Sequence, residues 1–165
     1  IKVKTSIYSD TDIKLIENII NNLRCIGDDA SKATYIPDIP NINKWFCEQS
    51  INGLSILKEN IEIMACDNEK VRDYLLIVLA GIIRKVSNAD EVSPKPYIST
   101  RFPKQPAEPF ELFFKTESLY REAIVEFSSK VKDNNCSSII LDSCDARTIN
   151  TSKKNRSCSN ITAVH

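Results

Sequence analysis

The sequence predicts a mainly α-helical chain that ends in two short β-strands. Its 165 residues, 42% of them hydrophobic and 27% charged, suffice for one compact domain with a real core, or for one lobe of a larger fold. Apolar residues recur three and four positions apart from about residue 11 to residue 133, which is the period of helices that bury one face. Short, uniformly apolar runs then replace this period, and such runs are typical of buried strands.

Four apolar stripes predict four helices. The first covers about 11–26, with Asp10 or Thr11 as its N-cap and Gly27 as a left-handed residue at its end. The second begins at Ser50, and the fourth begins at Pro109 and ends near residue 133. The third, 69–87, starts at Asp67 or Asn68 and is apolar nearly all round, which favours a place in the centre of a bundle. The stripes are Ile13, Ile16, Ile20 and Leu23; Ile51, Leu54, Leu57, Ile61 and Met64; Val71, Leu75, Val78, Leu79, Ile82 and Val86; and Phe113, Tyr120, Ile124, Phe127 and Val131.

Prolines predict two irregular connections, because proline fixes its own backbone and disfavours helix in the residue before it. Residues 28–43 form the first, and they lead into a short turn that carries Trp45 and Phe46 and that Asn43 could cap. Residues 92–107 form the second, with four prolines and no acidic side chain. We expect an ordered loop there, and long ordered loops in compact domains tend to be functional.

Two strands are expected at 138–141 and 161–164, joined by the polar stretch 148–160. The chain begins at Ile1 rather than at a methionine and stops in or just after the second strand. A truncated strand leaves backbone groups without partners, so we expect a piece of a longer polypeptide.

Composition argues against several classes of protein and site. Six cysteines with no Cys-x-x-Cys pair, and a single histidine at position 165, offer no zinc-ligand spacing, so we expect free buried thiols and no metal. The common nucleophile and phosphate-loop motifs are missing. A net charge of zero argues against strong sequence-independent binding to polyanions. No apolar run approaches the ~20 residues of a membrane span, and no secretory signal is present, which predicts a cytoplasmic protein.

Cations and aromatic rings alternate in the stretch 93–104, which predicts a nucleic-acid contact. Lys95, Arg101 and Lys104 stand among Tyr97 and Phe102 with no acidic residue between them. Cations suit phosphate contacts, and aromatic rings suit stacking on bases or sugars. The alternative is a solvated surface loop whose aromatic side chains pack against the helices. A second basic cluster, 153–156, is more simply explained by solvation.

Two aspartates follow the first predicted strand, at positions 142 and 145. Ligands of open α/β sheets bind beyond the carboxyl ends of strands, so these carboxylates are candidate ligand contacts. A turn residue or a helix cap is the alternative for both.

Several short runs resemble an internal segment of the amino-methylating DNA methyltransferases of restriction-modification systems. Those runs are Val86-Ser87-Asn88-Ala89, Ser93-Pro94-Lys95-Pro96-Tyr97, Arg101-Phe102-Pro103-Lys104 and Ile139-Ile140-Leu141-Asp142-Ser143-Cys144-Asp145-Ala146-Arg147. The resemblance covers nearly the whole chain and implies three parts of a larger Rossmann-like α/β enzyme. Residues 1–9 resemble the end of a cofactor-domain helix, 10–135 a helical insertion for target recognition, and 136–165 the return to the methyltransferase sheet, just before the catalytic Ser/Asp-Pro-Pro-Tyr.

The resemblance implies S-adenosylmethionine as cofactor and double-stranded DNA, together with the rest of the enzyme, as partners. Asp145 matches the acidic residue that accepts a hydrogen bond from the cofactor's adenine, and Ala146 matches its neighbour at the ring. Asp142-Ser143-Cys144 departs from the glycine that usually precedes this pair. The resemblance makes Lys95, Tyr97, Arg101 and Lys104 the DNA-contact candidates, and implies no catalytic residue within this segment. The alternative is a noncatalytic α-helical interaction module.

Overall fold

The computed structural model describes residues 3, 6–28 and 33–133, and this part of the chain is mainly helical, as predicted. Both predicted strands, with Asp142, Asp145 and Ala146, lie outside the described residues. The described residues form helices α2 (Asp10–Asp28), α3 (Ile42–Trp45), α4 (Glu48–Met64), α5 (Glu69–Val86) and α6 (Pro109–Asp133). Within the described residues, no helix has the length and apolar character needed to cross a membrane.

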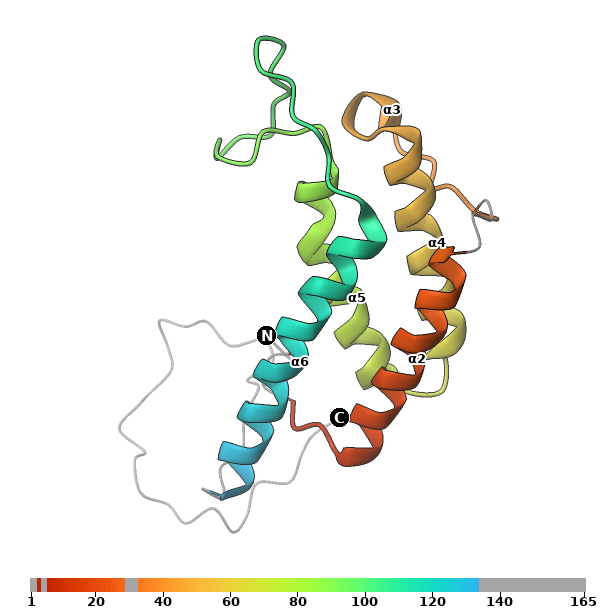
Figure 1. The fold of residues 1–165 in the computed structure, drawn as a ribbon, viewed down its shortest axis with the longest axis vertical. Helices are drawn as coiled ribbons and strands as arrows, with labels where there is room; N and C mark the ends of the chain where they lie inside the picture. The colour runs from red at the N-terminus through yellow and green to blue at the C-terminus, as the bar shows by residue number, and fades with distance from the viewer. Residues whose placement is uncertain (1–2, 4–5, 29–32, 134–165) are drawn as a thin grey trace, which may run out of the picture.

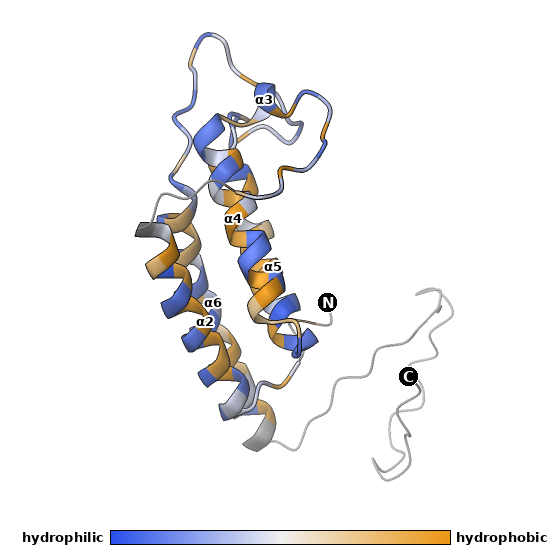
Figure 2. Ribbon diagram, turned by 90° about the vertical axis from the view of Figure 1, so that its right-hand side faces the viewer, coloured by the Kyte–Doolittle hydropathy of each residue, from blue (hydrophilic) through white to orange (hydrophobic). Residues whose placement is uncertain are grey.

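The long helices α2, α4, α5 and α6 pack side by side as a bundle (Figure 1), and each of them contacts the other three. Their apolar faces point inward (Figure 2), because burying these faces provides the main favourable free energy of folding. The most buried side chains come from all four long helices and from the segment before α2. They include Tyr8, Ile16, Leu23, Leu57, Ile61, Leu75, Val78, Ile82 and Phe113.

The prediction that the third helix is central is confirmed only in part. Helix α5 packs against all three of the other long helices. Its outer side nevertheless faces solvent, with Ile77 41% and Ile83 43% exposed. A bundle of four helices leaves one side of each helix uncovered, so an all-round apolar pattern does not bury α5 completely.

The N-terminus of α2 is capped by Ser9, one residue before the predicted Asp10 or Thr11. The Asp12 carboxylate accepts from the Ser9 N–H at 2.9 Å, and the Asp12 N–H donates to Ser9 Oγ at 3.2 Å. This reciprocal pair is a capping box with aspartate in the third position.

The end of α2 also differs from the prediction. Gly27 is helical rather than left-handed, and α2 continues to Asp28. A Cβ at Gly27 would meet the ring of Phe110 at 3.0 Å, so this glycine permits the close approach of α6 rather than a turn.

Among the starts of α3, α4 and α5, only that of α5 has a side-chain cap hydrogen bond. Asn68 caps α5 as predicted, because its side chain accepts from the Val71 N–H at 3.1 Å. The second predicted helix, α4, begins at Glu48 rather than Ser50. Asn43 lies inside α3 and caps nothing; the N-cap position belongs to Asn41, whose backbone is left-handed at φ 58°.

A buried carboxylate ties the N-termini of α2 and α5 together. Asp12 accepts from Lys70 Nζ at 2.8 Å and from Asn68 Nδ2 at 3.0 Å, in addition to Ser9. Burial raises the pKa of Asp12, but these hydrogen bonds lower it by more, and the net pKa is well below the ordinary value. The carboxylate that completes the capping box of α2 thus also binds Asn68, the cap residue of α5.

A second buried carboxylate, Glu117, lies between α5 and α6 and is 1% exposed. The Tyr74 hydroxyl donates to its Oε1 at 3.3 Å, and Arg121 Nε lies 3.3 Å from the same oxygen. Burial raises the pKa of Glu117, and Arg121 and Tyr74 offset only part of this effect.

Candidate nucleic-acid interface

The predicted loop leaves α5 at a helix end where the last three backbone carbonyls, those of Arg84, Lys85 and Val86, accept hydrogen bonds from outside the helix. The last carbonyls of a helix have no partner within the helix and need donors from elsewhere. Arg84 O accepts from the Ser87 hydroxyl at 2.8 Å and from Lys104 Nζ at 2.7 Å. Lys85 O accepts from the Ala107 N–H at 3.3 Å, which joins the far end of the loop to the same helix turn. The base of the loop is therefore closed on α5.

The first half of the loop is folded around Arg84 and Asp90. The Arg84 guanidinium donates to Asp90 O at 2.8 and 3.1 Å and also to Ser93 O. The Asp90 carboxylate accepts from the N–H groups of Val92 and Ser93, at 3.0 and 2.8 Å. The Asp90 N–H in turn donates to Tyr97 O at 2.9 Å. These bonds place Tyr97 without any regular secondary structure.

Lys104 belongs to the base of the loop rather than to its tip. Its Nζ lies 3.0 Å from a Glu91 carboxylate oxygen, and its side chain is only 16% exposed. The stretch 92–107 contains no acidic residue, but an expectation from this that its cations have no acid nearby is wrong for Lys104. Glu91 lies one residue before the acid-free stretch 92–107, and the loop turns back to bring it next to Lys104.

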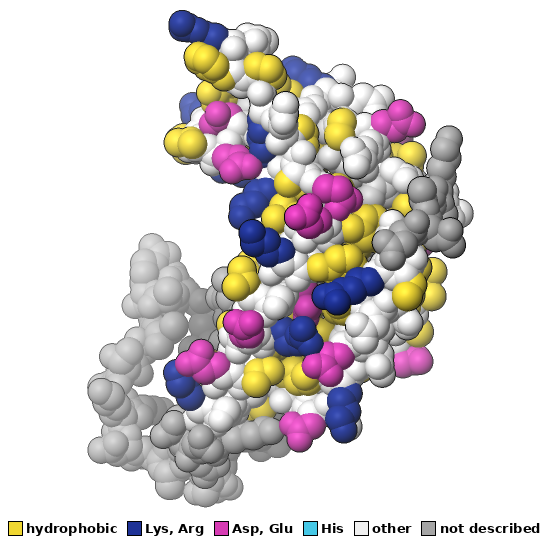
Figure 3. Space-filling model, viewed as in Figure 1, with side chains coloured by type: hydrophobic (Ala, Val, Ile, Leu, Met, Phe, Trp, Pro, Cys, Tyr) yellow, Lys and Arg dark blue, Asp and Glu magenta, His cyan; other side chains and the backbone are white. Residues whose placement is uncertain are grey.

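Lys95 and Arg101 are exposed, and the described residues provide no ion pair for either. Arg101 Cζ lies 5.4 Å from the centroid of the Phe102 ring. Phe102 is 73% exposed and Tyr97 47% exposed. The alternative in which these aromatic side chains pack against the helices is thus wrong for Phe102. Cationic and hydrophobic side chains gather on the projecting loop at the top of Figure 3.

Helix α3 lies at the same end of the molecule as this loop (Figures 1 and 2), which the sequence did not predict. The Asn88 N–H donates to Trp45 O at 2.7 Å, and Asn88 Nδ2 donates to Lys44 O at 3.1 Å. Lys44 Nζ lies 5.8 Å from the centroid of the Trp45 ring. The sequence predicts a short turn that carries Trp45. No local pattern indicates that this turn lies beside the loop.

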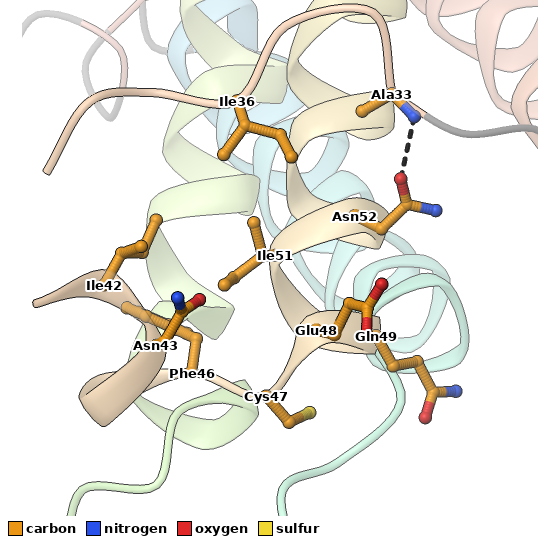
Figure 4. Close-up of a pocket in the computed structure, with 10 residues that line it drawn as sticks. All are labelled: Ala33, Ile36, Ile42, Asn43, Phe46, Cys47, Glu48, Gln49, Ile51 and Asn52. Carbon is orange, nitrogen blue, oxygen red and sulfur yellow. Dashed lines mark hydrogen bonds between the residues drawn. The ribbon is translucent and has the colours of Figure 1, made fainter.

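An open pocket of about 970 Å³ lies between residues 33–43 and the start of α4. Ile36, Phe46 and Ile51 line it (Figure 4), together with Cys47 at its edge. Burial raises the pKa of the Cys47 thiol, but hydrogen bonds from Ser50, whose Oγ lies 3.2 Å from Cys47 Sγ, and from backbone N–H groups at the start of α4 lower this pKa by more. None of the predicted site residues Lys95, Tyr97, Arg101 and Lys104 lines this pocket.

The described cysteines form no disulfide and no metal site. Cys25, Cys47 and Cys66 are free, as predicted, but exposed rather than buried. Among the described residues, no group of three or more side chains is arranged to hold a metal ion.

Comparisons with known proteins give no further assignment. A scan of protein-family models, a search of curated proteins and a search of solved structures each found no match to this chain.

Proposed function

We propose that this chain is the DNA-contacting helical part of an S-adenosylmethionine-dependent DNA methyltransferase of a restriction-modification system. The enzyme would methylate an exocyclic amino group of adenine or cytosine. One observation carries the DNA contact: a loop fixed at its base to α5 presents Lys95, Arg101 and two exposed aromatic rings. The methyl-transfer chemistry rests on the resemblance in sequence.

The geometry of the loop suits local contact with a DNA backbone. Lys95 and Arg101 can neutralise phosphates, while Tyr97 and Phe102 offer surfaces for bases or sugars. Hydrogen bonds at the loop base and prolines within it reduce the freedom that binding would otherwise remove. Lys104 supports this arrangement as a positioning residue.

Within the proposed enzyme the target base is turned out of the duplex, because its amino group is inaccessible in stacked DNA. Asp145 would accept a hydrogen bond from the adenine of the bound cofactor, and Ala146 would leave room for the ring. The cofactor supplies the methyl group. The residues that position the target amino group would come from a Ser/Asp-Pro-Pro-Tyr motif after residue 165.

The methyltransferase half of the proposal is tested by reading the gene in both directions. A Phe-x-Gly-x-Gly-like motif upstream and Ser/Asp-Pro-Pro-Tyr directly downstream would support the proposal, and the absence of both would overturn it. The 165-residue chain alone should not incorporate labelled methyl groups into duplex DNA, and stoichiometric incorporation would contradict this division of the enzyme.

Asp145 provides a direct test of the cofactor site in the complete enzyme. Asp145→Asn replaces a charged acceptor by a neutral one and should weaken binding of S-adenosylmethionine by roughly 1 to 3 kcal/mol, with folding spared. Titration calorimetry measures this change. An unchanged dissociation constant in a folded variant would assign Asp145 to a turn or a helix cap.

The DNA half is tested by fluorescence anisotropy of a labelled duplex with the 165-residue chain. Replacing Lys95 and Arg101 together by Ala should weaken binding roughly tenfold or more, because each loses a charged contact. Lys14→Ala with Lys58→Ala is the matched control, since it removes two exposed lysines from α2 and α4. Equal losses in both double variants would contradict a specific role for the loop.

A noncatalytic interaction module is the second candidate. Three apolar side chains lie exposed along the segment before α3: Tyr35 at 64%, Ile36 at 54% and Ile39 at 51%. Such a patch suits contact with another protein. Absence of DNA binding, together with absence of both flanking motifs, would favour this function.

A further inference from the structure

Helix α3 is held in a fixed position beside the start of the loop. The carbonyls of Lys44 and Trp45 lie at the C-terminal end of a one-turn helix, where no partner exists within the helix. Asn88 supplies a donor to each of them, at 3.1 and 2.7 Å. Two segments more than forty positions apart in sequence therefore lie side by side.

Each segment carries a cation next to an aromatic ring. Lys44 Nζ lies 5.8 Å from the centre of the Trp45 ring, and Arg101 Cζ lies 5.4 Å from that of Phe102. Lys44 is exposed, and no ion pair to it occurs among the described residues. A cation beside a ring can contact a phosphate while the ring meets the neighbouring sugar or base.

The acidic side chains of the loop do not compete for these cations. Glu91 pairs with Lys104, and the Asp90 carboxylate accepts two backbone N–H groups of the loop. Lys44, Lys95 and Arg101 are therefore available to an anionic partner at this end of the molecule.

We propose that α3 forms part of the same DNA-contacting surface as the loop, with Lys44 contacting the phosphate backbone and Trp45 lying against the DNA. This inference rests on the proposed function and adds two residues that the sequence did not single out. Asn88 acts as the positioning residue that joins the two segments.

Trp45 itself reports on this proposal, because it is the only tryptophan in the chain. A duplex with a distant label is titrated into the 165-residue protein while anisotropy and tryptophan emission are followed together, with free tryptophan correcting for absorption by DNA. We expect the emission to change and to saturate at the same DNA concentration as the anisotropy. Lys44→Gln should weaken binding about fivefold and lower the slope of log affinity against log salt by up to about 0.9.

Lys14→Gln is the control, because Lys14 is an exposed lysine near the start of α2, at the opposite end of the bundle from α3 (Figure 1). It should leave both the affinity and the salt slope unchanged. Binding by anisotropy with constant tryptophan emission would overturn the role of Trp45. A Lys44→Gln variant that binds like Lys14→Gln would overturn the role of Lys44. Either result leaves the proposed role of the loop intact if the Lys95→Ala/Arg101→Ala variant still binds DNA more weakly than the parent chain. If the parent chain causes no change in anisotropy at all, the proposed function itself is overturned.

Discussion

Replacing Lys104 by methionine tests whether this lysine stabilises the base of the loop. Methionine keeps most of the apolar stem and removes the ammonium group, which donates to Arg84 O at 2.7 Å and pairs with Glu91 at 3.0 Å. A hydrogen bond from a charged donor contributes about 1.5 to 3 kcal/mol, and a pair with a half-exposed glutamate about 0 to 1 kcal/mol. Arg84 O keeps its bond from Ser87, so the loss stays near the lower end, at about 2 kcal/mol.

This loss should appear as opening of the loop base. Hydrogen exchange of the Ala107 N–H, which donates to Lys85 O, should accelerate roughly thirtyfold, the factor that corresponds to about 2 kcal/mol of local stability. Lys95→Met is the control, because Lys95 is exposed and has no ion pair in the described part of the chain. Unchanged protection of Ala107 in Lys104→Met would refute the assignment of Lys104 to the loop base.

Two further predictions concern the bundle. The raised pKa of Glu117 means that the folded state holds its proton to higher pH than the unfolded state does, so stability falls as pH rises from the ordinary value of 4.5 through the folded pKa. Urea unfolding measures the free energy of unfolding across this pH range, and this free energy should decline less with pH in Glu117→Gln than in the parent. Identical pH profiles for the two proteins would contradict the effect of burial on Glu117. Gly53→Ala would bring a Cβ within 2.9 Å of the Pro109 ring, so it should destabilise the fold by about 1 to 3 kcal/mol despite alanine's higher helix propensity. A Tm equal to or above that of the parent would show that α6 shifts freely away from α4.

The long helices were predictable from the sequence because their apolar residues keep one period over many turns. Leu57, Leu75 and Phe113 lie in the core where the stripes place them. Boundaries were less predictable, since Ser9 competes with Asp10 and Thr11 as a cap and only the partner Asp12 decides between them. The sequence around Gly27 does not show whether this glycine ends a helix or permits the close approach of Phe110.

The candidate site was predictable in composition but not in arrangement. Exposed rings and cations at Tyr97, Arg101 and Phe102 follow from a loop that prolines keep out of regular structure. The pairing of Lys104 with Glu91 depends on how the loop turns back, and the position of α3 depends on two bonds from Asn88. Such contacts are set by tertiary structure and leave no periodic signal in the sequence.

The salt dependence of DNA affinity tests the central claim most directly. Binding of a duplex to the parent chain and to the Lys95→Ala/Arg101→Ala variant is measured over a series of salt concentrations. Counterion release predicts that the slope of log affinity against log salt falls by up to about 1.8 in the variant, at 0.9 for each lost phosphate contact. Equal slopes for the two folded proteins would contradict the claim that this loop contacts the DNA backbone.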